Sequence, residues 1–496
     1  MKKPTNRKSK TKRKPLTPQQ IEQRAYRKEI RSIFQNIGFS KVVGVSDHNF
    51  TFNNVTSDFD DVFIHENIIV FVEYTLTKSD KVGDHLKPKK IIYDEIVNNK
   101  IEFLNFYETQ FETFKEARSD YYDHEQNQII ILYCSKNTVN KKYKEIIANI
   151  KYFDYQIIKY FKSVSESIKL SARFEFFSFL GLKYDEVGQN AVKNDNSSNA
   201  YKGSILPHSH SNFNKGYKVV SFYVDPNSLL KRAYVLRKDG WRDEVGLYQR
   251  MIVKSKITTI RKYLLKEKRV FINNIIVTLP STTKLIDEQS NTIDPTKLTK
   301  TVPVVIQLPR GYNVIGLIDG QHRIFAYHEG GDKDDEIIKL RERQNLLVTG
   351  IIYPDNITAA DRTKFEANLF LEINSNQTNA KSDLKQAIGL LLKPYSSESI
   401  GKGVINRLND KGPLEDVFER HFYDSNKVKT TSIVSYALKP IVKLSGDDSF
   451  YSLWDNEKKT ELKAENNEEL LTDYISFCSD EINKFFGAIS KNLSYN

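Results

Sequence analysis

A glycine turn between an apolar run and a helix-like segment constrains the fold of this chain most strongly. Val314–Ile318 is apolar and of strand length, the next five residues read Asp-Gly-Gln-His-Arg, and Ile324–Tyr327 opens a helical pattern. Gly320 permits the sharp turn. The order predicts a strand, a tight turn and a helix N-terminus, whose free N–H groups and positive end favour an anion. Arg323 and His322 add donors that suit phosphate oxygens.

The composition is that of a globular protein long enough for two or three domains. The chain has 496 residues, of which 39% are hydrophobic and 28% charged. No apolar run reaches about 18 residues, so we expect no membrane partner, and the N-terminus carries no apolar export segment. The two cysteines, Cys134 and Cys478, are too few for a disulfide framework, and they favour a cytoplasmic protein.

Positive charge is concentrated at the N-terminus. Residues 1–14 hold eight lysines and arginines and no acid, out of a net charge of +12 for the whole chain. We expect residues 1–17 to form a basic, disordered arm that is attracted to nucleic acid. A solubilising extension without a site of its own explains these charges equally well.

The remaining chain reads as two α/β regions and a helical end. Residues 18–187 carry a helix at 18–37 and strand patterns at 40–45, 59–65, 67–76, 128–133 and 174–179. The polar stretch 188–216, rich in Asn, Ser, Gly and Lys, predicts a linker. Residues 217–400 form the second domain, with strands expected at 217–224, 271–279, 302–307 and 347–352 and a basic helix at 244–266. Residues 401–496 are expected to be helical.

Acidic residues of the first region fall where strand ends could meet. Glu29 lies on the first helix, Asp58, Asp60 and Asp61 open one strand, and Glu73 lies near the end of the next. Carboxylates that converge in this way can hold Mg²⁺ or Mn²⁺ and activate water for phosphodiester hydrolysis. We therefore hypothesise that Glu73 and Asp61, or Asp60, ligate a metal ion. The alternative is that these acids are solvated residues at a hairpin edge.

Over about residues 22–180 this order resembles the PD-(D/E)xK nuclease superfamily. The resemblance rests on Glu29, on Gly38-Phe39 before the first strand, on the aspartates of the hairpin, and on Glu73-Tyr74-Thr75 in place of Glu-x-Lys. It implies a restriction-endonuclease-like α/β domain. Thr75 replaces the lysine that would stabilise charge at phosphorus, and Lys78, or Lys87 and Lys89 of the next helix, could supply it. The implied catalytic residues are Glu29, Asp60, Asp61, Glu73 and Lys78.

Three blocks of the second region resemble the DGQHR-domain family of the wider ParB/sulfiredoxin-like group. They are Tyr248-Gln249-Arg250 through Leu264, Gly316 through Ala326, and Phe370 through Thr378. Such domains occur in DNA sulfur-modification clusters, including their DndB-type component, and in phage-defence gene neighbourhoods. The resemblance implies a ParB-like α+β domain that binds a nucleotide such as ATP or CTP, or a nucleic-acid phosphate. The implied binding residues are Asp319, Gly320, Gln321, His322, Arg323, Asn374 and Gln377.

Two simpler interpretations remain open in this region. An internal pair between Asp319 and Arg323 would fix the turn without any ligand. The basic helix offers Arg250, Lys254, Arg261 and Lys262 to DNA, although a solvated helix face explains the same charges almost as well.

These observations predict a DNA-binding or DNA-processing protein of a bacterial modification, restriction or anti-phage system. Its expected partners are DNA, a nucleotide and other components of such a system, and a second copy of the chain is a further candidate partner. In one version, a Mg²⁺-dependent endonuclease occupies the first domain. In the second, the chain is a non-catalytic DNA-binding regulator or assembly factor. In the third, the second domain hydrolyses a nucleoside triphosphate.

Overall fold

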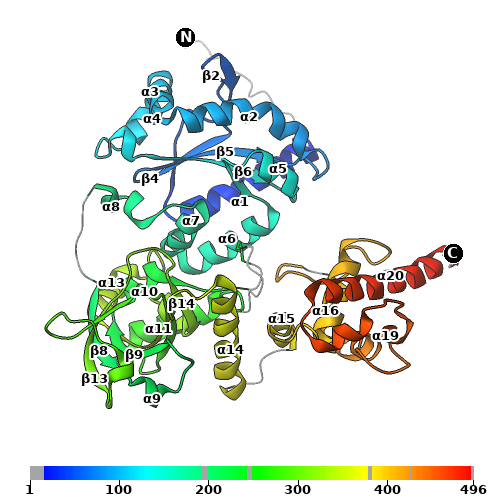
Figure 1. Ribbon diagram of the computed structural model, residues 1–496. Helices are drawn as coiled ribbons and strands as arrows, with labels where there is room; N and C mark the ends of the chain where they lie inside the picture. The colour runs from blue at the N-terminus through cyan, green and yellow to red at the C-terminus, as the bar shows by residue number, and fades with distance from the viewer. Residues whose placement is uncertain are drawn as a thin grey trace, which may run out of the picture. The chain divides into compact units, whose positions relative to one another are not determined.

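The computed structural model describes residues 16–192, 199–237, 240–242, 249–377, 382–424 and 426–492. The chain divides into two compact units, Met1–Ile158 and Lys159–Asn496, both of which mix helices and strands (Figure 1). The boundary therefore lies before the stretch 188–216 in which we expected a linker. No helix in the described ranges is long and apolar enough to cross a membrane. Most of the expected N-terminal arm, residues 1–15, lies outside the described residues.

The first unit opens with helix α1 (Pro18–Asn36), as predicted. The Thr17 hydroxyl accepts a hydrogen bond from the Gln20 backbone N–H at 3.2 Å, and Gln20 Oε1 accepts from the Thr17 N–H at 3.0 Å. This capping box satisfies two donors that a helix start leaves free. Pro18 at the first helical position adds the backbone angle that the helix requires.

A five-stranded mixed sheet forms the core of the first unit, in the order β1-β4-β5-β6-β7. Its strands are β1 (Ser40–Lys41), β4 (Asp61–His65), β5 (Ile68–Thr75), β6 (Gln128–Ser135) and β7 (Lys151–Phe153). The predicted hairpin is confirmed: β4 and β5 are antiparallel and joined at Glu66, whose φ is 51°. A second hairpin, β2 (Phe50–Phe52) with β3 (Val55–Ser57), was not predicted.

Helices cover both faces of this sheet. Phe34 of α1 stacks on Phe63 with ring centroids 4.1 Å apart, whereas Phe71 meets Phe103 on the other face at 5.4 Å. Successive side chains of a strand alternate between faces, so Phe63 and Phe71, on paired strands, reach opposite layers. The second layer contains α2 (Val82–Asn98), α3 (Lys100–Gln110) and α4 (Glu112–Ala117), and α5 (Lys141–Ile146) precedes β7.

An eight-stranded mixed sheet, curled into a half-barrel, organises the second unit. The order is β10-β14-β11-β15-β9-β8-β13-β12. The bounds are β8 (Ala200–Ile205), β9 (Lys218–Val224), β10 (Ala233–Tyr234), β11 (Ile275–Leu279), β12 (Lys284–Ile286), β13 (Val302–Gln307), β14 (Ile315–Asp319) and β15 (Leu346–Ile352).

Two sequence-based expectations fail in this unit. Residues 200–205 are not linker, because β8 pairs with β9 on one side and β13 on the other. Its polar composition is tolerated since only Ile205 is fully buried. Phe174–Phe179 is not a strand but part of helix α7 (Arg173–Leu180), which ends at Gly181 with φ of 81°. In a short apolar run that is buried on all sides, hydrophobic and polar residues do not alternate regularly, so the sequence cannot distinguish a strand from a helix.

Helices complete the second unit. The first of them, α6 (Tyr155–Ile168), begins in the first unit, and α8 (Gln189–Val192), α9 (His208–Ser211) and α10 (Pro226–Arg232) follow along the chain. The basic helix α11 (Lys254–Glu267) begins later than expected. It is followed by α12 (Gln321–Phe325), α13 (Asp334–Arg343), α14 (Ala359–Gln377) and α15 (Ser382–Leu392).

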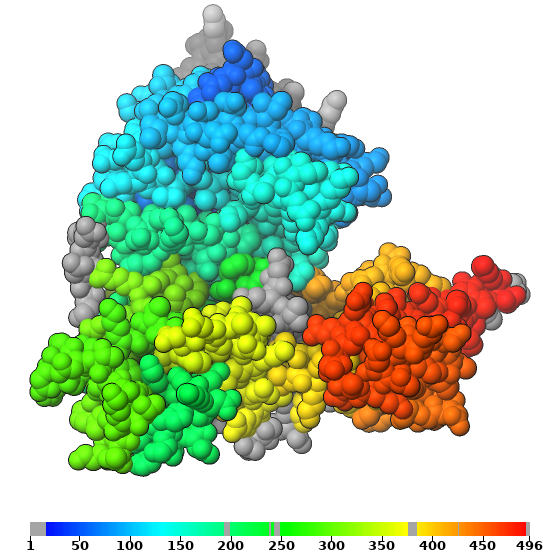
Figure 2. All heavy atoms as spheres, in the orientation of Figure 1, coloured from blue at the N-terminus to red at the C-terminus, as the bar shows by residue number. Residues whose placement is uncertain are grey.

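The end of the chain is helical, as predicted. It contains α16 (Ser397–Asp410), α17 (Thr430–Ser432), α18 (Lys439–Ile441), α19 (Phe450–Leu453) and α20 (Glu468–Asn492). These segments share their own apolar core, built around Val404, Val434, Trp454 and Tyr474. Figure 2 shows them as a continuous mass of orange and red atoms.

Candidate functional sites

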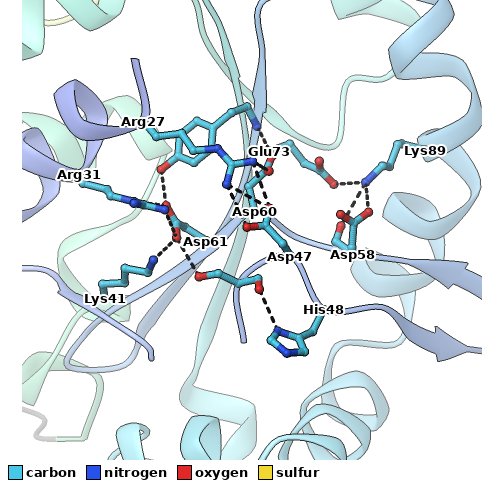
Figure 3. Close-up of polar contacts among 12 residues, drawn as sticks. Arg27, Arg31, Lys41, Asp47, His48, Asp58, Asp60, Asp61, Glu73 and Lys89 are labelled. Carbon is cyan, nitrogen blue, oxygen red and sulfur yellow. Dashed lines mark hydrogen bonds and ion pairs between the residues drawn. The ribbon is translucent and has the colours of Figure 1, made fainter. Parts of the chain in front are cut away.

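The acids predicted to form a metal site, Asp60, Asp61 and Glu73, lie at the open end of the β4–β5 hairpin. Asp61 pairs with Val72 across the hairpin, and the Asp60 N–H donates to the Val72 carbonyl at 3.0 Å. This register brings Asp60 beside Glu73 at the hairpin's end. Cations approach from two directions, Arg31 and Lys41 toward Asp61 and Lys89 toward Glu73 (Figure 3).

Glu73 forms the more unusual of these arrangements. Glu73 is only 2% exposed. The ammonium nitrogen of Lys89 on α2 lies 2.6 Å from Glu73 Oε1 and 3.0 Å from Asp58 Oδ1. Burial raises the pKa of Glu73 to about 8 against the opposing charge of Lys89, and Asp60 and Asp58 add to the rise. Burial opposes the charge on Lys89, but Glu73 and Asp58 outweigh it and raise the pKa of Lys89. The carboxyl of Glu73 therefore changes charge near neutral pH.

Asp61 lies on the α1 side of the sheet, away from Glu73. Arg31 Nε donates to Asp61 Oδ2 at 2.7 Å, Lys41 Nζ lies 2.6 Å from Oδ1, and the Tyr74 hydroxyl donates at 2.8 Å. Burial opposes ionisation of Asp61, but these bonds outweigh it and lower its pKa. The expected pairing of Asp61 with Glu73 is therefore not found, because neighbouring positions along the hairpin face opposite layers.

Asp60 occupies the position between the two groups. Its carboxylate pairs with Arg27 and accepts the Tyr74 backbone N–H at 2.7 Å. Burial raises the pKa of Asp60 to about 6, and the nearby carboxyl of Asp47 contributes to the rise. Asp60 and Glu73 are thus two adjacent carboxyls whose ionisation a further positive charge would favour.

The other predicted residues of this site have different outcomes. Glu29 is half-buried on α1, and its charge acts on the phenol of Tyr26. Three lysines could replace the one missing at position 75. Lys78 lies in the connection after β5, and Lys87 lies over the ring of Tyr143. Lys89 donates a hydrogen bond to Glu73. Sequence reasoning missed Arg27 and Arg31, although their spacing of four places both on one face of α1.

The donor set suits a hard divalent cation only in part. Among the described residues no group of three or more His, Cys, Asp and Glu side chains could hold a metal ion. Mg²⁺ often takes only one or two carboxylates and completes its shell with water and substrate phosphate. Asp60 and Glu73 meet that smaller requirement. Asp61 does not, because it lies on the opposite face of the sheet from Glu73, where it bonds Arg31, Lys41 and Tyr74.

In the second unit the Asp-Gly-Gln-His-Arg turn is built as predicted, with one correction. β14 ends at Asp319, Gly320 has φ of 101°, and α12 begins at Gln321. A φ of 101° strains any residue with a Cβ, and that atom would also lie 2.5 Å from Ile275 Cδ1, so the position favours glycine. Helix α12 is only five residues long, so the expected anion site at a helix N-terminus is not supported.

The turn carries its own ion pair. Arg323 donates to Asp319 Oδ2 at 2.7 Å and to the Asn274 carbonyl at 2.9 Å. This is the simpler interpretation considered from the sequence. Arg323 Nε and Gln321 Oε1 are nevertheless buried without a hydrogen-bond partner in the described structure, so the turn retains unused donors and acceptors.

The three sequence blocks converge on one cavity of about 410 Å³, which we call the motif cavity. Gln249 and Arg250 come from the first block, Ile318 to Arg323 from the second, and Phe370 and Asn374 from the third. Asn374 Nδ2 also donates to the Phe370 carbonyl at 2.8 Å. The side chain of Gln377 lies outside the described residues.

His322 contributes an uncharged imidazole to this cavity. Its Nε2 accepts the Val253 backbone N–H at 3.3 Å. Burial lowers the pKa of His322 to about 4, and Lys256, Arg237 and Arg323 lower it further. His322 is therefore a neutral hydrogen-bonding group at physiological pH and supplies no positive charge to an anion.

The four residues expected to contact DNA separate in the structure. Arg250 lines the motif cavity, whereas Lys254, Arg261 and Lys262 line a second cavity. Arg261 is 4% exposed and donates to the Ala326, His328 and Asp332 carbonyls. Its guanidinium holds a loop in place, which contradicts a direct role in DNA contact.

Comparison with protein-family models, curated proteins and solved structures finds no match to this chain.

Proposed function

We propose that the first unit cleaves phosphodiester bonds in DNA with the help of Mg²⁺ or Mn²⁺. The observation that carries the proposal is the position of Lys89, with Nζ 2.6 Å from Glu73 and 3.0 Å from Asp58. The lysine missing at position 75 of the sequence is thereby supplied by α2 at the same carboxylate. The result is the combination of acids and an ammonium group that phosphodiester hydrolysis requires.

Each residue then has a defined task. Lys89 orients the attacking water and stabilises the negative charge that develops at phosphorus. Glu73 and Asp60 supply carboxylate oxygens at the hairpin's end. A bound divalent ion would polarise the phosphoryl oxygen and lower the pKa of a water. Arg27 and Arg31 hold Asp60 and Asp61 in place from α1.

A plasmid-nicking assay with each metal tests this proposal. We expect Glu73→Gln and Lys89→Met to lower cleavage at least about a hundredfold, as loss of an electrostatic catalytic group does. Lys90→Met is the matched control, because Lys90 follows Lys89 on α2 and pairs instead with Asp94. Cleavage that survives Glu73→Gln, or its absence in the unaltered protein with both metals, would overturn the proposal in favour of a non-catalytic DNA-binding role.

A second candidate function belongs to the motif cavity. We propose that it binds a nucleotide such as ATP or CTP, or a DNA phosphate, because segments separated by more than a hundred residues line this one space. Arg250 offers the charge, since Arg323 already pairs with Asp319. Titration calorimetry should show weaker binding for Arg250→Ala, with the exposed Arg310→Ala as the control. Equal affinities for the two variants would remove this candidate.

We place these activities in DNA modification, restriction or phage defence. The support is the resemblance of the sequence blocks to the DGQHR-domain family and of the hairpin to PD-(D/E)xK nucleases. Phosphate release from ATP or CTP that depends on Asp319 and Arg323 would instead identify the second unit as a nucleoside triphosphatase.

A further inference from the structure

A second cavity in the second unit is larger than the motif cavity and shares no lining residue with it. It measures about 670 Å³ and is lined by α11, the end of α6 and the loop before α13. Five lysines line it, and we call it the lysine cavity: Lys169, Lys254, Lys262, Lys266 and Lys333. Helix α11 separates the two cavities, since Lys256 and Ile260 line the motif cavity.

The charges of the lysine cavity favour an anion. Lys254, Lys262 and Lys266 repeat at helical spacing along one face of α11. Lys254 and Lys262 form no ion pair within the described residues. Glu166, Asp332 and Glu336 are the acids among the lining residues, so the lysines outnumber them.

Buried polar contacts fix one wall of this cavity. Arg261 donates to the Ala326, His328 and Asp332 carbonyls at 3.1, 2.8 and 2.9 Å and to Asp334 at 3.1 Å. A Cβ on Gly331 would lie 2.3 Å from His328 Nε2. The loop that carries Gly331 is therefore held against the His328 ring, with no room for a side chain.

His328 adds a directional hydrogen-bond acceptor. It lines the cavity although it is only 5% exposed, and its Nδ1 lies 2.8 Å from the Phe325 carbonyl. A carbonyl only accepts, so Nδ1 carries the proton and Nε2 keeps a lone pair. Burial, followed by the charge of Arg261, lowers the pKa of His328 to about 4, so the ring is neutral. A lone pair binds a hydroxyl or amino donor and repels a phosphate oxygen.

We propose that the lysine cavity binds a small phosphorylated molecule that also carries hydroxyl or amino donors, a nucleotide or a sugar phosphate. Its phosphate lies among the lysines of α11, and its donor groups face His328 and the acids of the rim. A volume of about 670 Å³ is within the range of about 300–1,000 Å³ for small-molecule sites. This site is independent of the function proposed for the first unit and of the motif cavity.

Calorimetric titration of the full chain with ATP, ribose 5-phosphate, pyrophosphate and a short single-stranded DNA tests the proposal. We expect Lys262→Glu to weaken ATP or ribose 5-phosphate about tenfold or more, because one charge-assisted phosphate contact is lost and a repulsion is added. Lys339→Glu, an exposed reversal on α13 outside both cavities, should leave the affinity unchanged. Both lysines are exposed, so neither reversal should prevent folding.

Three results would overturn this assignment. One is equal affinity of the Lys262→Glu and unaltered proteins for every probe, and another is the absence of small-molecule binding at millimolar concentration. The third is a loss of affinity in Lys256→Glu without a loss in Lys262→Glu, because that result would assign the ligand to the motif cavity. Binding of the single-stranded DNA alone, lost with Lys262→Glu, would identify a nucleic-acid surface and also exclude the proposed ligand.

Discussion

Each unit contains a carboxylate–cation pair at its candidate site, and the two pairs differ in how far they are removed from water. Glu73 and Lys89 have side chains 3% and 19% exposed and come from separate elements. Asp319 and Arg323 are 30% and 21% exposed and lie four residues apart on one turn. Burial raises the pKa of Glu73 in the buried pair to about 8, and a perturbation of this kind is typical of sites that do chemistry. The local pair chiefly shapes its own turn.

The largest expected effect is on the pH dependence of the buried pair. The pKa of Glu73 rises from an ordinary 4.5 to about 8 in the folded protein, so its stabilising contribution is complete below pH 4.5 and disappears as the pH rises through 8. Raising the pH from 6 to 9 should lower the stability of the first unit by about 3 kcal/mol, at about 1.4 kcal/mol per pKa unit. Hydrogen exchange of the β5 amides in a chelating buffer measures this, and Glu73→Gln should remove the dependence.

Removing the cation should give the next largest effect. Lys89→Met removes the partner of Glu73 and also the partly exposed pair with Asp58. At pH 6, where the Glu73 carboxyl is protonated, we expect a loss of less than about 1 kcal/mol. At pH 9 we expect a loss of about 2 kcal/mol in urea unfolding, the value of a hydrogen bond to a charged group. Lys90→Met should stay within about 0.5 kcal/mol at both pH values. Equal losses at pH 6 and 9 would show that packing of the lysine stem dominates.

The stability of the Asp-Gly-Gln-His-Arg turn in the second unit should depend more on its backbone conformation than on its charges. Gly320→Ala forces a side chain into φ of 101° and toward Ile275, so we expect a loss of about 1–2 kcal/mol. Gly487→Ala in α20 is the control, since its Cβ meets only Pro413 at 3.9 Å and alanine favours a helix. Thermal unfolding should therefore show opposite shifts for the two variants.

The smallest effect is expected for the local pair itself. Asp319→Asn should cost less than about 1 kcal/mol, because a partly exposed ion pair gains little over its hydration. Urea unfolding at low and high salt provides the measurement. A loss above about 2 kcal/mol would show that the Asp319–Arg323 pair is as important to its unit as the buried pair is to the first unit.

Sequence patterns predicted the local elements of both sites well. The helix from residue 18, the hairpin of the strands at 59–65 and 67–76, and the glycine turn at 320 depend on residues close together in the chain. The patterns failed for Phe174–Phe179 and for residues 200–205, where pairing and burial by distant segments decide the structure. They also left Asp61 and Asp60 as alternative partners of Glu73, and only the strand's alternation separates them by sending Asp61 to the other face.

The sequence alone determined which charges and turns this protein has, because caps, glycine turns and apolar periods act within a few residues. Only the tertiary structure decided which cation meets which acid. Lys89 reaches Glu73 and Arg31 reaches Asp61 because β5 is buried between two helical layers. The convergence of three distant blocks on the motif cavity likewise depends on packing, as does the division of the α11 lysines between the motif cavity and the lysine cavity. Burial then sets the pKa values, since desolvation depends on what surrounds a group and not on its neighbours in the chain.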